Sequence, residues 1–333
     1  MDIFFAGNYF GTGGPWNVNK NIVECLKGKA SFTHFKSKIL RMMEMIYKIV
    51  NSKVIVFSGI SSVDHITVPI AKKLHKRIIY IMHGCLSWEY EQNNYFSNQR
   101  GIDNERLMLE MADKILCVSS FYKEQISERY PQYRQKLGVL TNGINWNVLT
   151  KNRNMSITRD DSSIVLIGGG RVTKRNLQVC QAVEEINKED NVNIKVAVYG
   201  YYNDNDDSKA ISQISCTRYH HVIPQTELFN VLNRTALFVQ NSDFEPFSLG
   251  TIEALSCGCS VLVSHNVGAR EVIKELTDDD VINDVMDISE LKSKIRKVMR
   301  QGNNERLWSS IDKSTTSNEA SVERLLAIAH SFI

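Results

Sequence analysis

The sequence lacks the features of a membrane-spanning or exported chain. No stretch of its 333 residues reaches about eighteen apolar positions, so we expect no segment that crosses a bilayer. The first residues have no basic cluster before their apolar run and lead into a glycine loop, which indicates a first strand rather than a signal peptide. No internal repeat or low-complexity segment is visible. These absences favour a cytoplasmic globular protein.

Reactive cysteine pairs and strong net charge are absent as well. The seven cysteines include no Cys-x-x-Cys pair, because Cys257 and Cys259 are one residue too close, and most lie in apolar runs. We interpret them as buried free thiols in a reducing compartment. A formal net charge of +3 is too small to indicate a nucleic-acid partner. The length suits two domains, each with material for a core.

Short apolar runs of strand length alternate with helical patterns throughout the chain. The first series covers residues 3–6, 54–57, 78–82, 115–118 and 137–140. The second series covers residues 164–167, 194–199, 221–223, 237–240 and 260–264. Alternation of this kind predicts parallel sheets with helices on both faces, and two series predict two doubly wound α/β domains. The polar stretch 151–162 is the predicted linker.

Residues 241–255 form the most informative segment. They place Glu245 and Glu253 eight positions apart, between a strand-like run and a helix-like run. Ser248 and Gly250 suit a helix start and the close approach of a ligand to the backbone. Free amides at a helix start bind phosphate. In this interpretation Glu245 holds a sugar, the amides a diphosphate and Glu253 the hydroxyls of a ribose. The alternative is two surface glutamates spaced by chance.

This segment resembles the retaining glycosyltransferases of the GT-B fold, in particular family 4, also called group 1. That family ends its donor site with the motif E-x-F-G-x-x-x-x-E-A, which Glu245-Pro246-Phe247 and Glu253-Ala254 match. Downstream matches are Ser256-Cys257-Gly258, Val261-Leu262-Val263 and Gly268-Ala269-Arg270-Glu271. The resemblance implies two Rossmann-like domains facing a central cleft. It implies donor-binding roles for Phe247, Ser248, Leu249, Gly250 and Glu253.

Two positions depart from the family pattern. Ser248 stands where the family has glycine, and Ser260 stands where proline is common before the strand. A serine keeps an oxygen that can cap the helix, so we expect Ser248 to be tolerated. No consequence is expected from Ser260.

A basic loop follows the first strand of the predicted second domain. Its sequence, residues 168–176, is Gly-Gly-Gly-Arg-Val-Thr-Lys-Arg-Asn. It resembles the family segment whose arginine and lysine hold the donor diphosphate. Fixed cations stabilise the negative charge that builds on phosphate as the sugar leaves, without a metal. Arg171 is assigned the arginine role, and Lys174 or Arg175 the lysine role. A solvated basic loop is the alternative.

Two features of the predicted first domain also fit a donor site. Residues 7–15 form a glycine-rich loop between a strand and a helix, where exposed amides can cradle phosphate. In the family such a loop closes over the donor, which gives Gly13 and Gly14 a donor-binding role; a plain glycine-rich turn is the alternative. His83 ends an apolar run, at a point where a family histidine touches the transferred sugar. A purely structural histidine is equally compatible with the sequence.

An Asp-x-Asp pair in the second half of the chain is a possible metal site. Asp204-Asn205-Asp206-Asp207 contains an Asp-x-Asp pair of the kind that grips a diphosphate through a metal in the other large glycosyltransferase fold. It lies in a polar run, which favours a solvated loop. Because the cations of residues 171–175 already supply the charge, we expect no metal and no other cofactor.

Residues 20–53 carry eight basic and two acidic side chains, and residues 35–50 have the pattern of a basic helix with a wide apolar face. Such a helix can rest on an anionic membrane surface, near a lipid-linked acceptor. The alternative is an ordinary helix that turns its apolar face to the core of the first domain and its lysines to water.

The sequence therefore predicts an acceptor-binding domain at 1–150, a nucleotide-sugar domain at 151–315, and a terminal helix at 316–333 that packs on the first domain. The predicted reaction is retaining transfer of a hexose or N-acetylhexosamine from a nucleoside-diphosphate sugar, with UDP favoured, to a hydroxyl of a glycan or lipid-linked glycan in surface-polysaccharide synthesis. The alternatives are a nucleotide-sugar epimerase of the same fold and a non-catalytic partner subunit. Apolar residues on the terminal helices fit either the core or a second copy.

Overall fold

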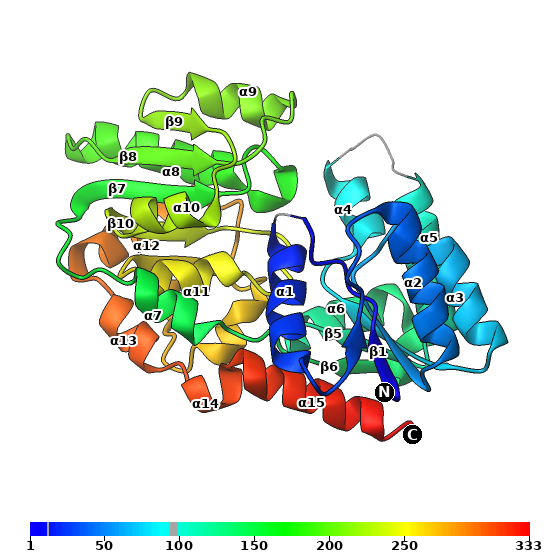
Figure 1. Ribbon diagram of the computed structural model, residues 1–333. Coiled ribbons are helices and arrows are strands. Elements are labelled where there is room, and N and C mark those ends of the chain that lie inside the picture. Colours follow the sequence, from blue (N-terminus) through cyan, green and yellow to red (C-terminus); the bar gives the residue numbers. More distant parts are fainter. Residues whose placement is uncertain (12, 94–98) are drawn as a thin grey trace. The chain divides into compact units, whose positions relative to one another are not determined.

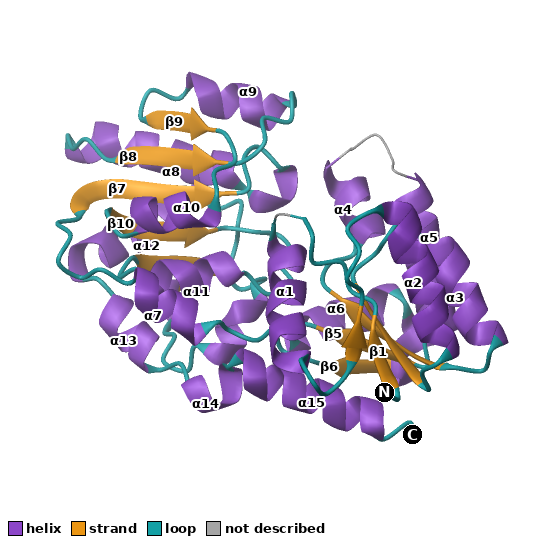
Figure 2. Ribbon diagram, in the orientation of Figure 1, coloured by secondary structure: helices purple, strands orange, loops and turns teal. Residues whose placement is uncertain are grey.

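The computed structural model describes residues 1–11, 13–93 and 99–333, and these form two compact units (Figure 1). The first unit contains Met1–Asn145 together with Lys313–Ile333, and the second contains Trp146–Asp312. Each unit has a six-stranded, wholly parallel sheet between helices, as Figure 2 shows. The prediction of two doubly wound sheets is confirmed. The polar stretch 151–162 lies inside the second unit, since its last residues begin strand β7.

The strands of the first unit follow the order β2-β1-β3-β4-β5-β6. They are β1 Ile3–Phe5, β2 Ser31–Phe32, β3 Val54–Ser58, β4 Arg77–Met82, β5 Lys114–Cys117 and β6 Leu137–Val139. The helices are α1 Gly14–Leu26, α2 Lys38–Val50, α3 Asp64–Lys73, α4 Leu86–Asn93, α5 Gln99–Met111, α6 Ser120–Arg129, α14 Lys313–Thr316 and α15 Asn318–His330, with a 3₁₀ turn η1 at Pro131–Lys136. The strand order reverses between β1 and β3. That is the point where doubly wound folds bind ligands at the carboxyl ends of their strands.

The last helix of the chain packs on the first unit. Helix α15 contacts α1, and the Ser321 hydroxyl donates to the carbonyl of Thr141 at 2.9 Å. Ile144 also pairs with Ser317, where the chain re-enters this unit, through a parallel bridge. These contacts make the carboxyl-terminal residues part of the core that the first sheet organises.

The strands of the second unit follow the order β12-β11-β10-β7-β8-β9. They are β7 Asp160–Ile167, β8 Lys195–Tyr199, β9 Thr217–His220, β10 Thr235–Gln240, β11 Ser260–Ser264 and β12 Val281–Ile282. The helices are α7 Trp146–Asn152, α8 Asn176–Asp190, α9 Asp206–Gln213, α10 Gln225–Leu232, α11 Leu249–Ser256, α12 Ile288–Gln301 and α13 Asn304–Ser309, with 3₁₀ turns η2 Val172–Lys174, η3 Gly268–Val272 and η4 Asp278–Asp280. Here the order reverses between β7 and β10, which predicts the ligand site of this unit.

Buried branched side chains explain the second sheet. Strands β7, β8 and β10 turn isoleucine, leucine and valine toward α8 and α12, and the whole cluster is almost inaccessible to water. Because a parallel sheet is covered on both faces, its central strands are continuous apolar runs, and these were the runs that the sequence revealed. Strand β9 is the exception: it lies at Thr217–His220, not at the predicted 221–223.

The seven cysteines are free thiols, and five of them are buried. Burial raises the pKa of the Cys85 thiol to about 11 and that of Cys117 to about 12, so both stay protonated near neutral pH. Among the described residues, no helix has the length and apolarity needed to cross a membrane.

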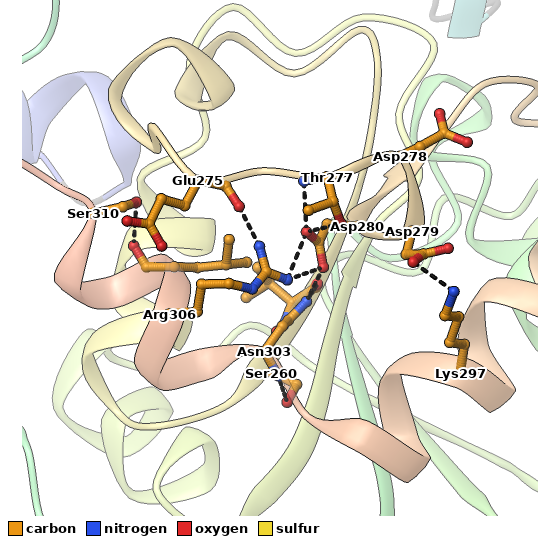
Figure 3. A network of polar contacts seen from close by, with 12 residues as sticks. Ser260, Glu275, Thr277, Asp278, Asp279, Asp280, Lys297, Asn303, Arg306 and Ser310 are labelled. Carbon is orange, nitrogen blue, oxygen red and sulfur yellow. Dashed lines mark hydrogen bonds and ion pairs between the residues drawn. The ribbon is translucent and has the colours of Figure 1, made fainter.

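A buried carboxylate joins the edge of the second sheet to helix α13 (Figure 3). Asp280 is 1% exposed and accepts hydrogen bonds from Arg306 Nη2 at 2.9 and 3.0 Å, and from Asn303 Nδ2 at 2.7 Å. The amide and hydroxyl of Thr277 also donate to it, each at 2.8 Å. Burial alone would raise the pKa of Asp280, but these donors outweigh burial and lower the pKa below its usual value.

We expect Asp280→Ala to destabilise the second unit on the order of 2–4 kcal/mol, because Arg306 and Asn303 lose their acceptor. Thermal unfolding followed by circular dichroism measures the change. Since the pKa of Asp280 is lowered in the folded state, its contribution is present above the unfolded value of about 3.9 and is lost as the pH falls below it.

The neighbouring Asp279 provides the matched control. It pairs with Lys297 at 2.6 Å, but the two side chains are 49% and 45% exposed. We expect Asp279→Ala to cost at most about 1 kcal/mol. Equal losses of stability in the two variants would contradict the role given to the buried network.

Candidate functional site

Two loops flank the point where the strand order of the second unit reverses. The first follows β7 and contains the glycines and basic residues 168–175, and the second follows β10 and contains residues 241–248. Both leave the carboxyl ends of adjacent strands, since β7 pairs directly with β10. The two motifs that the sequence singled out, 71 positions apart at Lys174 and Glu245, are therefore neighbours in this unit.

The glycine loop requires its glycines. Gly168 and Gly169 have φ angles of +112° and +60°, which residues with a side chain rarely adopt. A Cβ on Gly169 would lie 2.3 Å from the carbonyl oxygen of Tyr201, and one on Gly170 would lie 2.0 Å from the Ser208 hydroxyl. The Gly170 amide donates to the Tyr219 hydroxyl at 2.7 Å. Close packing against the β8 and β9 ends therefore fixes the backbone that carries the basic residues.

The three basic residues of this loop have different partners. Lys174 is 8% exposed and forms an ion pair with Glu245. Arg175 has a left-handed backbone (φ +47°) and donates Nε to Asp243 Oδ2 at 2.5 Å. Arg171 is half-buried and donates Nε to the Gly168 carbonyl at 3.3 Å; no carboxylate in the described part of the chain forms an ion pair with it. Of the three, Arg171 is thus the cation whose charge is not matched within the unit.

Main-chain hydrogen bonds hold the second loop in place. The Asp243 amide donates to the Thr173 carbonyl at 3.0 Å, which joins this loop to the glycine loop. Glu245 forms a parallel bridge with Val267, and the Ala269 amide donates to the Phe247 carbonyl at 2.6 Å. The side chain of Phe247 is 2% exposed. Burial raises the pKa of the Asp243 carboxyl, while Arg175 opposes that rise.

Ser248 does not cap helix α11, so that part of the sequence prediction is wrong. Its side chain makes no cap hydrogen bond; it meets the Thr251 hydroxyl at 2.9 Å and donates to Gln240 Oε1 at 3.3 Å. Its φ angle is +79°, a value that favours glycine. The family's glycine at this position is therefore explained by backbone conformation, and the serine is held in that conformation by buried hydrogen bonds.

Helix α11 begins at Leu249 directly after this turn. The first amides of a helix have no partner within the helix, so those of Leu249 and Gly250 point outward from its start. A Cβ on Gly250 would make only ordinary contacts, 3.6 Å from Ile167 Cδ1 and from Phe238 Cζ. The protein's own packing therefore does not demand a glycine at this position.

Glu253 lies in the second turn of α11 and is held by a neighbouring helix. The side-chain amide of Gln225, the first residue of α10, donates to Glu253 Oε1. Burial raises the pKa of the Glu253 carboxyl, and the hydrogen bond from Gln225 opposes the rise. No group among the described residues donates to the other carboxylate oxygen of Glu253, so that oxygen can accept a hydrogen bond from a ligand.

In the first unit, His83 follows β4 and belongs to a chain of hydrogen bonds. The Ser58 hydroxyl donates to Asn19 Oδ1 at 2.6 Å, so the contact between Ser58 Oγ and His83 Nε2 at 2.8 Å has the imidazole as its donor. His83 Nδ1 then carries the lone pair, and among the described residues this buried atom has no hydrogen-bond partner. Burial lowers the pKa of His83 to about 4, so the ring is neutral near pH 7.

Gly13 and Gly14 begin helix α1 of the same unit. Gly13 has a φ angle of +118°, so a backbone turn explains its glycine, whereas a Cβ on Gly14 would meet no atom within 4 Å. Thr12, in the glycine-rich loop of residues 7–15, lies outside the described residues. The structure thus places Gly13, Gly14 and His83 in the first unit, and Arg171 to Glu253 in the second.

Sequence reasoning did not identify the residues that hold the motif side chains. These are Asp243, which pairs with Arg175, together with Asn19 and Ser58, which fix the tautomer of His83. Gln225, the partner of Glu253, is a further such residue. Each lies far from its partner in the chain, so no local pattern links the two.

The Asp-x-Asp stretch begins helix α9. Asn205 caps that helix by accepting from the Ser208 amide at 2.9 Å, and Asp206 and Asp207 lie in its first turn. Asp204 pairs with Lys209 at 3.3 Å. Within residues 1–11, 13–93 and 99–333, no three potential metal ligands are grouped closely enough to hold an ion.

We expect His83 to make stability pH-dependent. The folded ring binds a proton only near pH 4, whereas the unfolded ring binds one near pH 6.5. Stability should therefore fall as the pH decreases from about 6.5 toward 4, by up to about 1.4 kcal/mol per pH unit. Urea unfolding across this pH range should show a smaller decrease in the free energy of unfolding for His83→Gln than for the wild type. The exposed His330→Gln should match the wild type, and an unchanged profile in His83→Gln would contradict the assignment.

Comparison with known proteins gives the fold and the family. Residues 150–314 match the family model of the glycosyl transferases group 1. The chain is similar to HepE from Anabaena, solved with UDP and glucose, at 13% identity over 100% of both chains and a TM-score of 0.69. A sucrose-phosphate synthase from Thermosynechococcus elongatus is 14% identical over 99% of this chain and 98% of that one, with a TM-score of 0.67.

A glycosyltransferase from Rickettsia africae is also similar, at 14% identity over 99% of this chain and 98% of that one, with a TM-score of 0.66. The comparison with curated protein sequences gave no match. The two parallel sheets in two Rossmann-like units and the matched segment agree with one another. Residues 150–314 belong to the glycosyl transferases of group 1, and the chain has the GT-B fold.

Proposed function

We propose that the protein is a retaining glycosyltransferase that moves a hexose or N-acetylhexosamine from a UDP-sugar to a hydroxyl of a glycan or lipid-linked glycan, in the assembly of a surface polysaccharide. The observation that carries the proposal is that the loop with Arg171 and Lys174 and the loop that leads into α11 leave the carboxyl ends of the paired strands β7 and β10, and that the Lys174–Glu245 ion pair joins the two loops.

Arg171 is the main counter-charge for the donor in this proposal. Its charge is not matched by a described carboxylate, whereas Arg175 is held by Asp243 at 2.5 Å. A diphosphate brought to this loop would gain a charge-assisted pair with Arg171 without breaking an existing one. Both Lys174 and Arg175 are paired with a carboxylate, and we assign the lysine role to Lys174 because its partner is Glu245, the residue assigned to the sugar.

Lys174 and Glu245 would act as a unit. Their side chains are only 10% and 17% exposed, so their electrostatic interactions are stronger than in bulk water. The charge of the Lys174 ammonium would attract a phosphate oxygen. Glu245 can accept from sugar hydroxyls with its other oxygen, and the ion pair fixes both groups before the donor binds.

The proposed chemistry needs no side-chain nucleophile. The bond between the anomeric carbon and the β-phosphate oxygen breaks, and its electron pair remains on the phosphate. The acceptor oxygen bonds to the anomeric carbon on the same face, and its proton passes to the departing phosphate. Arg171, Lys174 and the α11 amides stabilise the charge that builds on the leaving group. These cations supply what a metal would otherwise bring, and we propose a metal-independent reaction.

Glu253 and His83 would recognise other parts of the donor. Glu253, oriented by Gln225, would accept from the ribose hydroxyls. His83 would accept from a hydroxyl of the transferred sugar through Nδ1, whose lone pair is fixed there because Nε2 donates to Ser58. The choice of UDP is supported by HepE, which was solved with UDP and with UDP-glucose.

We expect Arg171→Ala to reduce donor turnover about 100-fold, because one fixed cation is removed from the developing charge. A panel of nucleotide-sugars, first screened by thermal stabilisation, supplies the donor, and release of the nucleotide measures turnover. Arg300→Ala, an exposed arginine on α12, is the matched control and should behave like the wild type. Turnover of Arg171→Ala within twofold of the control would count against the proposal.

The same assay separates the alternatives. An epimerase would convert the donor to its epimer without any acceptor, and a non-catalytic subunit would release no nucleotide with any donor. A transferase should release nucleotide slowly from donor and water and faster with its acceptor.

We expect Glu253→Ala to weaken UDP binding about 10- to 150-fold, because a hydrogen bond to a charged group is removed. Inorganic pyrophosphate should bind the variant and the wild type equally, since Glu253 is assigned to the ribose. Isothermal titration of both ligands measures the two effects. A parallel loss of UDP and pyrophosphate affinity would show that Glu253 acts on the loop rather than on the ribose.

A further inference from the structure

Helix α2 turns most of its apolar side chains to solvent. Only Arg41, Met45 and Ile49 are buried on this thirteen-residue helix. The exposed apolar side chains on α2 and just before it range from 47% to 69% in exposure, and they are Phe35, Ile39, Leu40, Met43, Tyr47 and Val50. Spacings of three and four residues place these helical positions on one face. We call this set the α2 stripe.

The rotation of α2 about its axis is fixed by polar contacts on its inner face. Arg41 donates Nη2 to the Ser61 hydroxyl at 3.2 Å and faces Asp64, whose pKa is raised to about 7 by burial. Met45 and Ile49 are 0% exposed in the core beside it. Turning the α2 stripe inward would expose those two side chains and disrupt the Arg41 contacts. The alternative that the sequence left open, an ordinary helix facing the core, describes the face that carries Met45 and Ile49, but it leaves the α2 stripe at the surface.

Glu44 fixes the segment that leads into the helix. It accepts from the amides of His34 and Phe35 at 2.7 and 3.2 Å, and it pairs with Lys48 at 3.2 Å. The backbone of Phe35 is thereby held just before the start of the helix. A contiguous row of this kind is uncommon on a soluble surface and marks an interaction site.

Basic side chains lie at both ends of the α2 stripe. Lys36 and Lys38 are exposed at its amino-terminal end. At the other end the Lys76 ammonium donates to the Val50 carbonyl at 2.8 Å, and Lys73 is exposed close by in the chain. Glu44, the acidic residue of α2, is already bonded to His34 and Lys48. The surface around the stripe is thus apolar in the middle and positive at its ends.

We propose that the α2 stripe docks on the surface of an anionic lipid bilayer, with its apolar side chains at the boundary between the headgroups and the acyl chains and its lysines at the headgroups. An amphipathic helix with this distribution lies in the plane of the interface. A second copy of the chain fits less well, because either direction of α2 pairing brings positive ends together.

Docking would orient the first unit. Helix α2 follows β2, so its first turn lies at the carboxyl edge of the first sheet, the same edge that carries His83 after β4. The bilayer would then lie beside the edge where a lipid-linked acceptor is expected. This last step rests on the proposed function, whereas the membrane contact itself does not.

Sedimentation with vesicles tests the contact. We expect the wild type to bind vesicles of phosphatidylcholine and phosphatidylglycerol at about 50 mM salt, and to bind pure phosphatidylcholine vesicles much more weakly. Met43→Gln/Tyr47→Gln should lower the partition coefficient at least tenfold, since it removes two side chains from the interface. Lys36→Gln/Lys38→Gln should lower the partition coefficient roughly fivefold per lysine, and only on anionic vesicles.

The control is Val222→Gln/Met286→Gln, which replaces two apolar residues of the second unit that are 54% and 50% exposed. It should bind vesicles like the wild type, and all variants should keep the melting temperature of the wild type because the replaced residues are exposed. Wild-type binding by Met43→Gln/Tyr47→Gln would overturn the proposal. So would a wild-type dimer in solution that this variant converts to a monomer.

Discussion

The ion pair between Lys174 and Glu245 is the interaction on which the second unit's site depends. It joins the loop after β7 to the loop after β10, where the strand order reverses. The main-chain bond from Asp243 to Thr173 and the pair between Arg175 and Asp243 reinforce the same junction. In the loop after β7, Lys174 and Arg175 are each paired with a carboxylate, whereas Arg171 is paired with none that the structure describes. The ion pairs hold the two loops together, and the charge of Arg171 is left for a ligand.

Much of the fold and part of the site could be predicted from the sequence. The central strands are continuous apolar runs, and the motifs follow their ends, so local patterns located the glycine loop and the Glu245–Glu253 segment. Strand β9 was misplaced because it is a half-exposed edge strand without an apolar run, while Val222 in the following loop is apolar yet 54% exposed. Edge strands carry a weak signal for this reason.

Other features depend on contacts that no local pattern contains. Ser248 has a φ angle of +79° and its hydroxyl contacts Gln240 and Thr251 rather than a helix amide, so the expectation of a helix cap failed. The partners of Arg175, Glu253 and His83 lie 68, 28 and 25 positions away. The periodicity of α2 could not show which of its faces is buried. Arg41 is buried together with Met45 and Ile49, while the longer apolar row of the helix is exposed.

A crystal structure of the protein with UDP tests the central claim most directly. The account predicts the diphosphate between the Arg171 guanidinium, the Lys174 ammonium and the amides of Leu249 and Gly250, with the ribose at Glu253. Donor atoms within about 3 Å of phosphate oxygens would meet that expectation. A nucleotide bound elsewhere on the second unit, with Lys174 and Arg171 making no contact to its phosphates, would contradict the account.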